Sequence, residues 1–218
     1  KQHFEQTLAY SPRSATLKGL IIHTAADAGN VGPDYSYGWG LVDAKKAAEF
    51  VTEVAAASGI AQITQSTYSG TERTFTVTSH GNSPLTATLV WTDPAGTPKS
   101  GLDNSTSTLF NDLNLWITDA GGNTYYPWTL NPANPNAPAV RTQLNHVDNV
   151  EQVKIDLTDP GVYTIHIGAT GAVASQAFSL LVTNEEQVVG PQLVKIIPNA
   201  GGELQNGDTL HVAPRELL

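Results

Sequence analysis

The sequence predicts a mainly β protein: an antiparallel jelly-roll β-sandwich that follows two or three helices. Two observations lead to this prediction. Apolar residues recur at helical spacing through about the first fifty residues, and from about Ile60 onward they alternate with polar residues instead. The alternating segments are short, and turn residues separate them, which is typical of sandwiches and jelly rolls.

The first part of the chain is predicted to hold the helices. Residues 1–8 have the pattern of a helix end, and Ser11-Pro12 offers an N-cap and a first-turn proline for a second helix over 12–25. Asp43 can cap a third helix over 43–52. These helices have apolar faces that a monomer rarely exposes, so we expect them to pack on the sandwich or on a neighbouring molecule.

Three regions are expected along the chain. Residues 1–55 hold the helices, and residues 58–184 hold the sandwich. After a polar stretch, residues 188–218 are predicted to begin a further, immunoglobulin-like β-domain that the sequence truncates, with an extra hairpin of the sandwich as the alternative. The sandwich strands are predicted where apolar and polar residues alternate, at 85–91, 113–117, 155–157, 163–167 and 178–182.

Charge and composition exclude several classes of partner. The formal net charge of -9 argues against nucleic acid, which binds clustered basic residues. No apolar run approaches the roughly 20 residues of a membrane span, so no span is expected. Without Cys there is neither a disulfide framework nor a thiolate site. Without Met, we expect Lys1 to follow an upstream part that carries any export signal.

A set of ordered motifs lies in the helical region. Lys18 and Leu20 follow Ser11-Pro12 on the predicted second helix, and Gly38-Trp39-Gly40 precedes Val42-Asp43-Ala44. A glycine on each side of the indole allows a tight turn, and the aspartate caps the helix that follows. In this order and spacing the motifs resemble the carboxyl-terminal end of the catalytic domain of the subtilisin-like serine proteases, the subtilases.

The sandwich carries a second resemblance. Leu89 to Gly96, Phe110 to Leu115 and Asn145 to Glu151 are similar to the jelly-roll domain that follows the catalytic domain in some alkaline subtilases. In the related convertases a comparable sandwich, the P-domain, packs beside the catalytic domain and helps it fold. Together the two resemblances cover residues 1–184.

The resemblance implies a function. The chain would be the C-terminal portion of a secreted subtilisin-like serine endopeptidase, and its sandwich would stabilise the protease, shape substrate access, or do both. Its partners would be the upstream catalytic domain of the same polypeptide and the peptide or protein substrates of the parent. The parent would hydrolyse peptide bonds through a Ser-His-Asp triad. The triad motifs of the family are absent from this sequence, so no catalytic residue is assigned and the chain alone is expected to be inactive.

Acidic residues at strand ends predict a calcium site. Asp93 ends one strand and Asp112 begins another, and Asn114 shares the face of Asp112 because it lies two residues further along the strand. Asp103 and Asp148 lie in loops that can join them, and calcium prefers several such oxygen ligands. The alternative is that these residues form turns and bond the local backbone.

A binding module is the rival interpretation of the whole chain. Trp116, Tyr125, Tyr126 and Trp128 lie close together in sequence, and Trp116 is expected on the polar face of its strand. An exposed ring there can stack on a sugar or a peptide. The chain would then be a carbohydrate- or protein-binding sandwich without an enzymatic role. Packing of the indoles beneath the loop 131–138 is the alternative.

Two histidines are expected to have structural positions. His23 lies among isoleucines on the predicted second helix and is expected to be packed there. His166 alternates with apolar residues of a strand and is expected to face away from the core.

Overall fold

A computed structural model describes residues 1–102, 104 and 106–184. In this described part, three helices precede eight strands, and all of them belong to one compact unit. The helices are α1 (Gln2–Leu8), α2 (Ser14–His23) and α3 (Ala44–Ala56). The strands are β1 (Ala61–Tyr68), β2 (Arg73–His80), β3 (Leu85–Trp91), β4 (Asp112–Thr118), β5 (Thr124–Tyr125), β6 (Val150–Ile155), β7 (Pro160–Thr170) and β8 (Gln176–Asn184).

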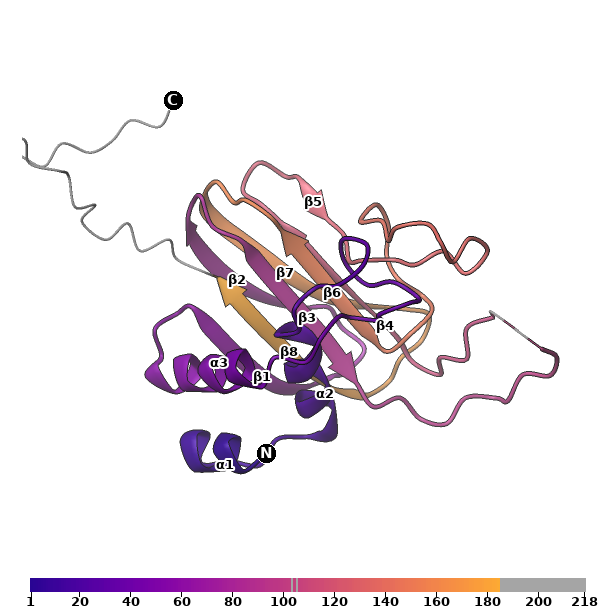
Figure 1. The fold of residues 1–218 in the computed structure, drawn as a ribbon, viewed down its shortest axis with the longest axis horizontal. Helices are drawn as coiled ribbons and strands as arrows, with labels where there is room; N and C mark the ends of the chain where they lie inside the picture. The colour runs from indigo at the N-terminus through magenta and orange to yellow at the C-terminus, as the bar shows by residue number, and fades with distance from the viewer. Residues whose placement is uncertain (103, 105, 185–218) are drawn as a thin grey trace, which may run out of the picture. The chain divides into compact units, whose positions relative to one another are not determined.

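The strands form two four-stranded antiparallel sheets, in the orders β1-β8-β3-β6 and β2-β7-β4-β5 (Figure 1). The first strand pairs with the last, the second with the second from last, and so on inward to β4 with β5. The successive pairs alternate between the sheets, which is the topology of a jelly roll. The fold class predicted from the alternation of apolar residues is therefore confirmed.

The main core lies between the two sheets. Alternate residues of every long strand point inward, as the two-residue period of a strand requires. Trp91, which is 1% exposed, closes one end of this core and donates its indole N–H to the carbonyl oxygen of Asn111 at 3.1 Å. The innermost side chains include Leu85, Leu89, Leu113, Leu115, Ile117, Ile165, Ile167, Phe178 and Leu180.

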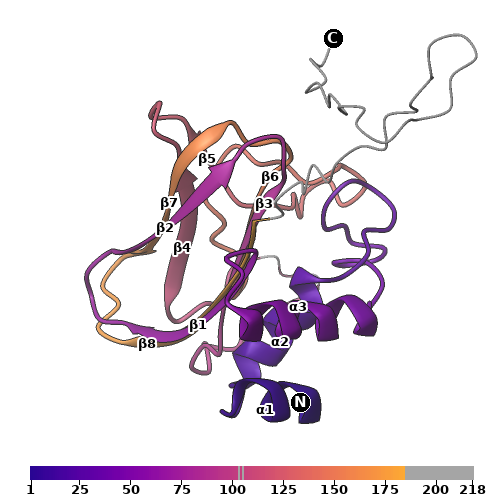
Figure 2. The ribbon, with the colours of Figure 1, turned by 90° about the vertical axis from the view of Figure 1, so that its left-hand side faces the viewer.

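The helices cover the outer face of the β1-β8-β3-β6 sheet, on the side away from the second sheet (Figure 2). A second core forms there from Phe4 of α1, Leu20 of α2, Phe50 and Val51 of α3, and Leu181 of β8. Because β8 sends Leu180 inward and Leu181 outward, it contributes to both cores. The expectation that the helices pack on the sandwich is confirmed.

Helix α2 approaches the sheet closely because Gly19 faces it. A Cβ atom at Gly19 would lie 2.6 Å from Leu181 Cδ1 and 3.2 Å from Val90 Cγ2. Glycine at a helix interior costs about 1 kcal/mol relative to alanine, so its position here is explained by the contact with the sheet. The helix axis can therefore lie directly over β8 and β3.

Buried polar contacts fix the register of α2 on the sheet. Thr16 Oγ1 lies 2.7 Å from Ser179 Oγ, and the two ring nitrogens of His23 lie 2.7 Å from Thr88 Oγ1 and 2.6 Å from Thr183 Oγ1. Burial lowers the pKa of His23 from 6.5 to about 3, and the nearby charge of Lys46 adds to this effect. The ring is therefore neutral at neutral pH, and the expectation of a packed histidine is confirmed.

Several local predictions can be compared with the structure. Asp43 caps α3 as expected, since its carboxylate accepts the Lys46 N–H at 2.8 Å. Ser11 does not start α2: the helix begins at Ser14, and the Ser11 hydroxyl donates to Glu5 at 2.7 Å instead. Leu157 is predicted in a strand, but β6 ends at Ile155 and Leu157 is exposed.

The region 188–218, predicted as a further β-domain, lies outside the described residues. Within the described part, none of the helices has the length and apolar character needed to cross a membrane.

The close approach of α2 predicts the effect of a larger side chain. Gly19→Leu should lower the free energy of unfolding by about 1–3 kcal/mol, because four extra carbon atoms must displace Leu181 or lift the helix. Urea unfolding with an unchanged m-value measures this. Ala55→Leu adds a larger side chain at an exposed position of α3 and should change stability by less than about 0.5 kcal/mol. Equal effects of the two substitutions would contradict the packing described.

Candidate functional site

Of the predicted metal ligands on β4, Asn114 is buried and Asp112 is half-buried, and both are partly unsatisfied. Asp112 and Asn114 occupy alternate positions of the strand, with Leu113 pointing into the core between them. Asp112 Oδ2 lies 2.8 Å from His146 Nδ1, and the Asn114 amide donates to Thr170 Oγ1 at 2.9 Å. The Oδ1 atoms of Asp112 and of Asn114 are buried and have no hydrogen-bond partner. Each of these oxygens is therefore available to accept a hydrogen bond or to coordinate a cation.

The other predicted ligands make backbone contacts. Both carboxylate oxygens of Asp93 accept N–H groups, from Phe110 at 2.6 Å and Asn111 at 2.9 Å, which are distant in sequence. Asp148 accepts the Val150 N–H at 3.1 Å. The Asp148 bond agrees with the alternative interpretation, in which Asp and Asn side chains bond the local backbone in turns. Asp103 lies outside the described residues.

Glu151 is a buried acidic residue that the sequence analysis did not single out. It lies on β6 and has no exposed surface, and its Oε2 accepts the Leu115 N–H of β4 at 2.6 Å. The bond joins β6, the edge strand of the first sheet, to β4 of the second sheet. Its Oε1 has no partner. The signal was present in the sequence, because Glu151 shares the core-facing alternation of Val153 and Ile155, where an acidic residue is exceptional.

Burial raises the pKa values of three carboxylates in this region. Burial raises the pKa of Glu151 well above 4.5, and Asp112 and Asp148 raise it further. Burial is also the main cause that raises the pKa values of Asp112 and Asp148. His146 partly offsets the effect at Asp112, and Asp93 adds to it. A bound cation would stabilise the charged forms of these groups.

We call the part of the structure that contains Asp93, Asp112, Asn114, Asp148 and Glu151 the acidic region. Its oxygen ligands fit calcium only in part. Unpartnered buried oxygens of Asp112, Asn114 and Glu151 are the hard oxygen ligands that calcium takes. However, among the residues that the structure describes, no three His, Cys, Asp or Glu side chains lie close enough together to hold a metal ion. A cation here would need the Asn114 amide oxygen, backbone carbonyls or water to complete its coordination shell.

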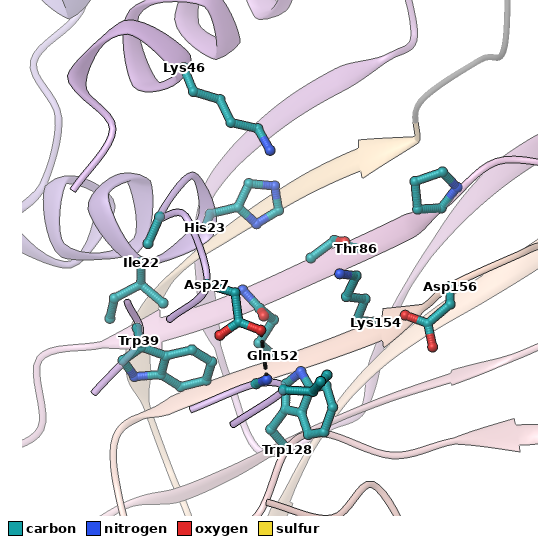
Figure 3. Close-up of a pocket in the computed structure, with 14 residues that line it drawn as sticks. Ile22, His23, Asp27, Trp39, Lys46, Thr86, Trp128, Gln152, Lys154 and Asp156 are labelled. Carbon is teal, nitrogen blue, oxygen red and sulfur yellow. Dashed lines mark hydrogen bonds between the residues drawn. The ribbon is translucent and has the colours of Figure 1, made fainter. Parts of the chain in front are cut away.

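A pocket of about 410 Å³ lies elsewhere, between the loop 25–40 and the outward face of β3 and β6 (Figure 3). Asp34 shapes the loop, since its carboxylate accepts the backbone N–H groups of Asn30, Ser36 and Tyr37. The pocket walls combine aromatic, apolar and charged side chains from the helices and the sheet. They include Ile22, His23, Asp27, Val31, Trp39, Lys46, Pro84, Thr86, Trp128, Gln152, Lys154 and Asp156.

The two tryptophans of the pocket have different environments. Trp128 is only 7% exposed: a Cβ at Gly32 would lie 2.9 Å from its ring, and the Arg141 guanidinium lies 4.5 Å from its ring centre. Its ring is therefore packed and cannot serve as an open platform for a sugar. Trp39 packs beside Val90 and Val150 on the sheet and remains partly exposed.

Trp116 lies on the outer face of the second sheet and not in the pocket. Its ring stacks on His166 with centroids 5.0 Å apart and planes 3° from parallel. His166 is held by Glu72 at 2.7 Å and by Thr118 at 2.8 Å. The expectation that His166 faces away from the core is confirmed, but its partners hold it in a half-buried position.

The described part of the chain is thus a β-sandwich with docked helices, a pocket at their junction and an acidic region around β4 and β6. No protein-family model matches the chain. A stretch of 181 residues is 24% identical to the Dictyostelium discoideum protein named serine protease/ABC transporter B family protein tagA. The match covers 81% of this chain and 10% of that protein, so the chain spans about a tenth of the length of the curated relative.

A solved structure matches part of the chain at lower similarity. It is PliG of Aeromonas hydrophila, a periplasmic lysozyme inhibitor of g-type lysozyme. The alignment covers 58% of this chain and 88% of that chain, with 16% identity and a TM-score of 0.34. Such a score carries no argument about the fold or the role of this chain.

The buried Glu151 predicts a characteristic pH dependence. Its folded-state pKa is raised, so the native protein retains the proton to a higher pH than the unfolded chain does. The contribution of this group to stability should therefore fall as pH rises from about 4.5 through the folded pKa, by about 1.4 kcal/mol for each pH unit in that interval. In the presence of a chelator, Glu151→Gln should remove this loss of stability with pH, because glutamine does not titrate. Its amide oxygen can still accept the Leu115 N–H.

Urea unfolding of both proteins between pH 5 and pH 8 measures the effect. Glu49→Gln, on an exposed position of α3, is the matched control and should follow the wild-type profile. Parallel profiles for the wild type and Glu151→Gln would show that Glu151 is not the buried titrating group.

Proposed function

We propose that this chain is the C-terminal portion of a secreted subtilisin-like serine endopeptidase, in which the sandwich braces the end of the catalytic domain. One observation carries the proposal: the helical segment that resembles the end of a subtilase domain shares a buried core with the sandwich. The 24% identity to a segment of a serine protease-containing protein supports the same assignment.

The shared core gives the bracing role a physical basis. Phe4, Leu20 and Phe50 of the helices contact Leu181 of the sheet, and Ala15 contacts Val90. Removing the sandwich would expose these apolar side chains to water, at a cost of about 25 cal/mol for each Å² of apolar surface. The free energy that holds the sandwich together would thereby hold the last helices of the catalytic domain in place.

The motif around Trp39 supports the resemblance at the level of geometry. Gly38 and Gly40 have φ values of 61° and 100°, and a Cβ at Gly40 would lie 2.2 Å from the Ala26 carbonyl oxygen. Leu41 and Ala26 exchange two backbone hydrogen bonds of 2.8 Å across this turn. Gly40 is therefore required for the loop to close and deliver Asp43 to the start of α3, whereas a Cβ at Gly38 would meet no neighbouring atom.

The proposal predicts where peptidase activity resides. The purified 218-residue chain should not hydrolyse casein, whereas the full polypeptide that contains it should do so and be blocked by a serine-directed inhibitor. In the full polypeptide, Gly19→Leu should shorten the half-life of activity on heating, and Ala55→Leu should not. Absence of inhibitor-sensitive activity from the full polypeptide would overturn the proposal, and an unchanged half-life would overturn the bracing role.

We further propose that calcium stabilises the sandwich through the acidic region, with Asp112 and Asn114 as the central ligands and Glu151 as a nearby buried carboxylate. The unpartnered oxygens of these three side chains support this. Asp93, Asp103 and Asp148, also predicted from the sequence, are secondary candidates, since Asp93 and Asp148 already accept backbone N–H groups.

Calcium dependence can be measured by thermal unfolding. Binding to the folded state alone should stabilise the protein by about 2.7 kcal/mol when free calcium is a hundredfold above its Kd. The melting temperature should then rise with calcium and fall with chelator, and Asp112→Ala should abolish the difference. Asp159→Asn, at an exposed turn, is the control and should keep it. A wild-type melting temperature that is the same in calcium and in chelator would exclude the site.

A further inference from the structure

The pocket of Figure 3 is lined by hydrogen-bond donors. The ammonium groups of Lys46 and Lys154 extend toward its middle from α3 and β6. Within the described part of the chain, neither ammonium has a hydrogen-bond or ion-pair partner, and the indole N–H groups of Trp39 and Trp128 have no acceptor. Both lysines are exposed, so water satisfies their ammonium groups in the free protein. A complementary ligand would supply acceptor oxygens and negative charge in place of that water.

The acidic residues of the pocket do not neutralise these donors. Asp156 pairs with Arg141 at 2.8 Å, and Asp27 accepts the Gly32 N–H at 3.0 Å. Both carboxylates nevertheless place negative charge at the pocket. Their charge opposes a dianionic phosphate more strongly than a carboxylate, which carries a single negative charge. Because the remaining carboxylate oxygens can accept N–H groups, they suit the amides of a peptide backbone.

The walls of the pocket add an apolar requirement. Ile22, Val31 and Pro84 line it together with the partly exposed ring of Trp39. A volume of about 410 Å³ is at the lower end of the range for sites that enclose small ligands or two or three residues of a peptide. The pocket thus combines an apolar wall, two ammonium groups and acceptors for amide N–H groups.

We propose that this pocket binds a short acidic peptide segment, with its carboxylate between Lys46 and Lys154 and an apolar neighbouring side chain against Trp39. The proposal goes beyond the bracing role and does not depend on it, since the pocket is formed wholly within this chain. The carboxylate can belong to a Glu or Asp side chain or to a peptide C-terminus, and the two sources share the same chemistry at the lysines.

The experiment is a titration of the full chain with three acetylated tripeptides, in which binding is monitored by tryptophan fluorescence and calorimetry. Acetyl-Leu-Glu-Leu-amide tests a side-chain carboxylate, and acetyl-Leu-Leu-Leu with a free C-terminus tests a terminal carboxylate. Acetyl-Leu-Gln-Leu-amide has no carboxylate and is the control. At least one of the two carboxylate peptides should bind at least tenfold more tightly than the glutamine peptide. Its affinity should fall as salt rises, because the two ammonium groups are exposed.

Substitutions assign the effect to the pocket. Lys46→Gln combined with Lys154→Gln should weaken the preferred peptide at least tenfold while leaving the melting temperature unchanged. Lys45→Gln, next to Lys46 on α3 but outside the pocket, should weaken it less than twofold. Equal binding of the glutamine peptide, equal effects of Lys45→Gln and the double variant, or inorganic phosphate binding as tightly as the peptides would each overturn the proposal.

Discussion

The docking of α2 on the outer face of β8 and β3 is the interaction on which the rest of the structure depends. It combines a glycine that lets the helix approach, a small apolar core, and a neutral imidazole held between two threonine hydroxyls. Packing alone tolerates a range of positions, whereas the His23 and Thr16 contacts permit only one register. An unpaired buried ring nitrogen would cost about 1–3 kcal/mol, so a shifted helix is unfavourable.

The position of α2 determines the position of the segments that come after it in the helical region. The loop 25–40 leaves the end of the helix, returns to Ala26 through the Leu41 bridge, and leads into α3 at Asp43. Gly32 of this loop rests against Trp128, which connects the helical segment to the strand β6 through its backbone bond to Gln152. The pocket exists only because these contacts hold the loop over the sheet.

The sequence predicted the sandwich well because its strands obey a simple constraint. Leu85, Leu89, Leu113 and Leu115 alternate with polar residues, and each long strand has one face in the core between the sheets. The same reasoning also required the helices to be covered by another element, and the sheet covers them. The Asp43 cap, which needs only neighbours in sequence, was also predicted correctly.

Features that depend on distant partners were not predictable from the sequence. Ser11 has the residue type of an N-cap, but its hydroxyl bonds Glu5 and the helix starts later. The strand alternation could have indicated the burial of Glu151 but not its partner, because Leu115 lies on the opposite sheet. Trp128 packs against Gly32, nearly a hundred residues away in sequence. In the acidic region, tertiary contacts likewise decide which carboxylate oxygens have no partner. Asp93 and Asp148 bond the backbone, whereas the Oδ1 atom of Asp112 has no partner.

Native-state hydrogen exchange tests most directly the claim that the helical segment and the sandwich form one cooperative unit. If they do, the amides of Leu20, Ile21 and His23 in α2 open with the same free energy as the central amides of β8, because neither element is stable without the other. Both sets should also lose protection together in Gly19→Leu. Exchange of the α2 amides roughly a hundredfold or more faster than that of β8 would show that the helices only rest on a sandwich that folds alone.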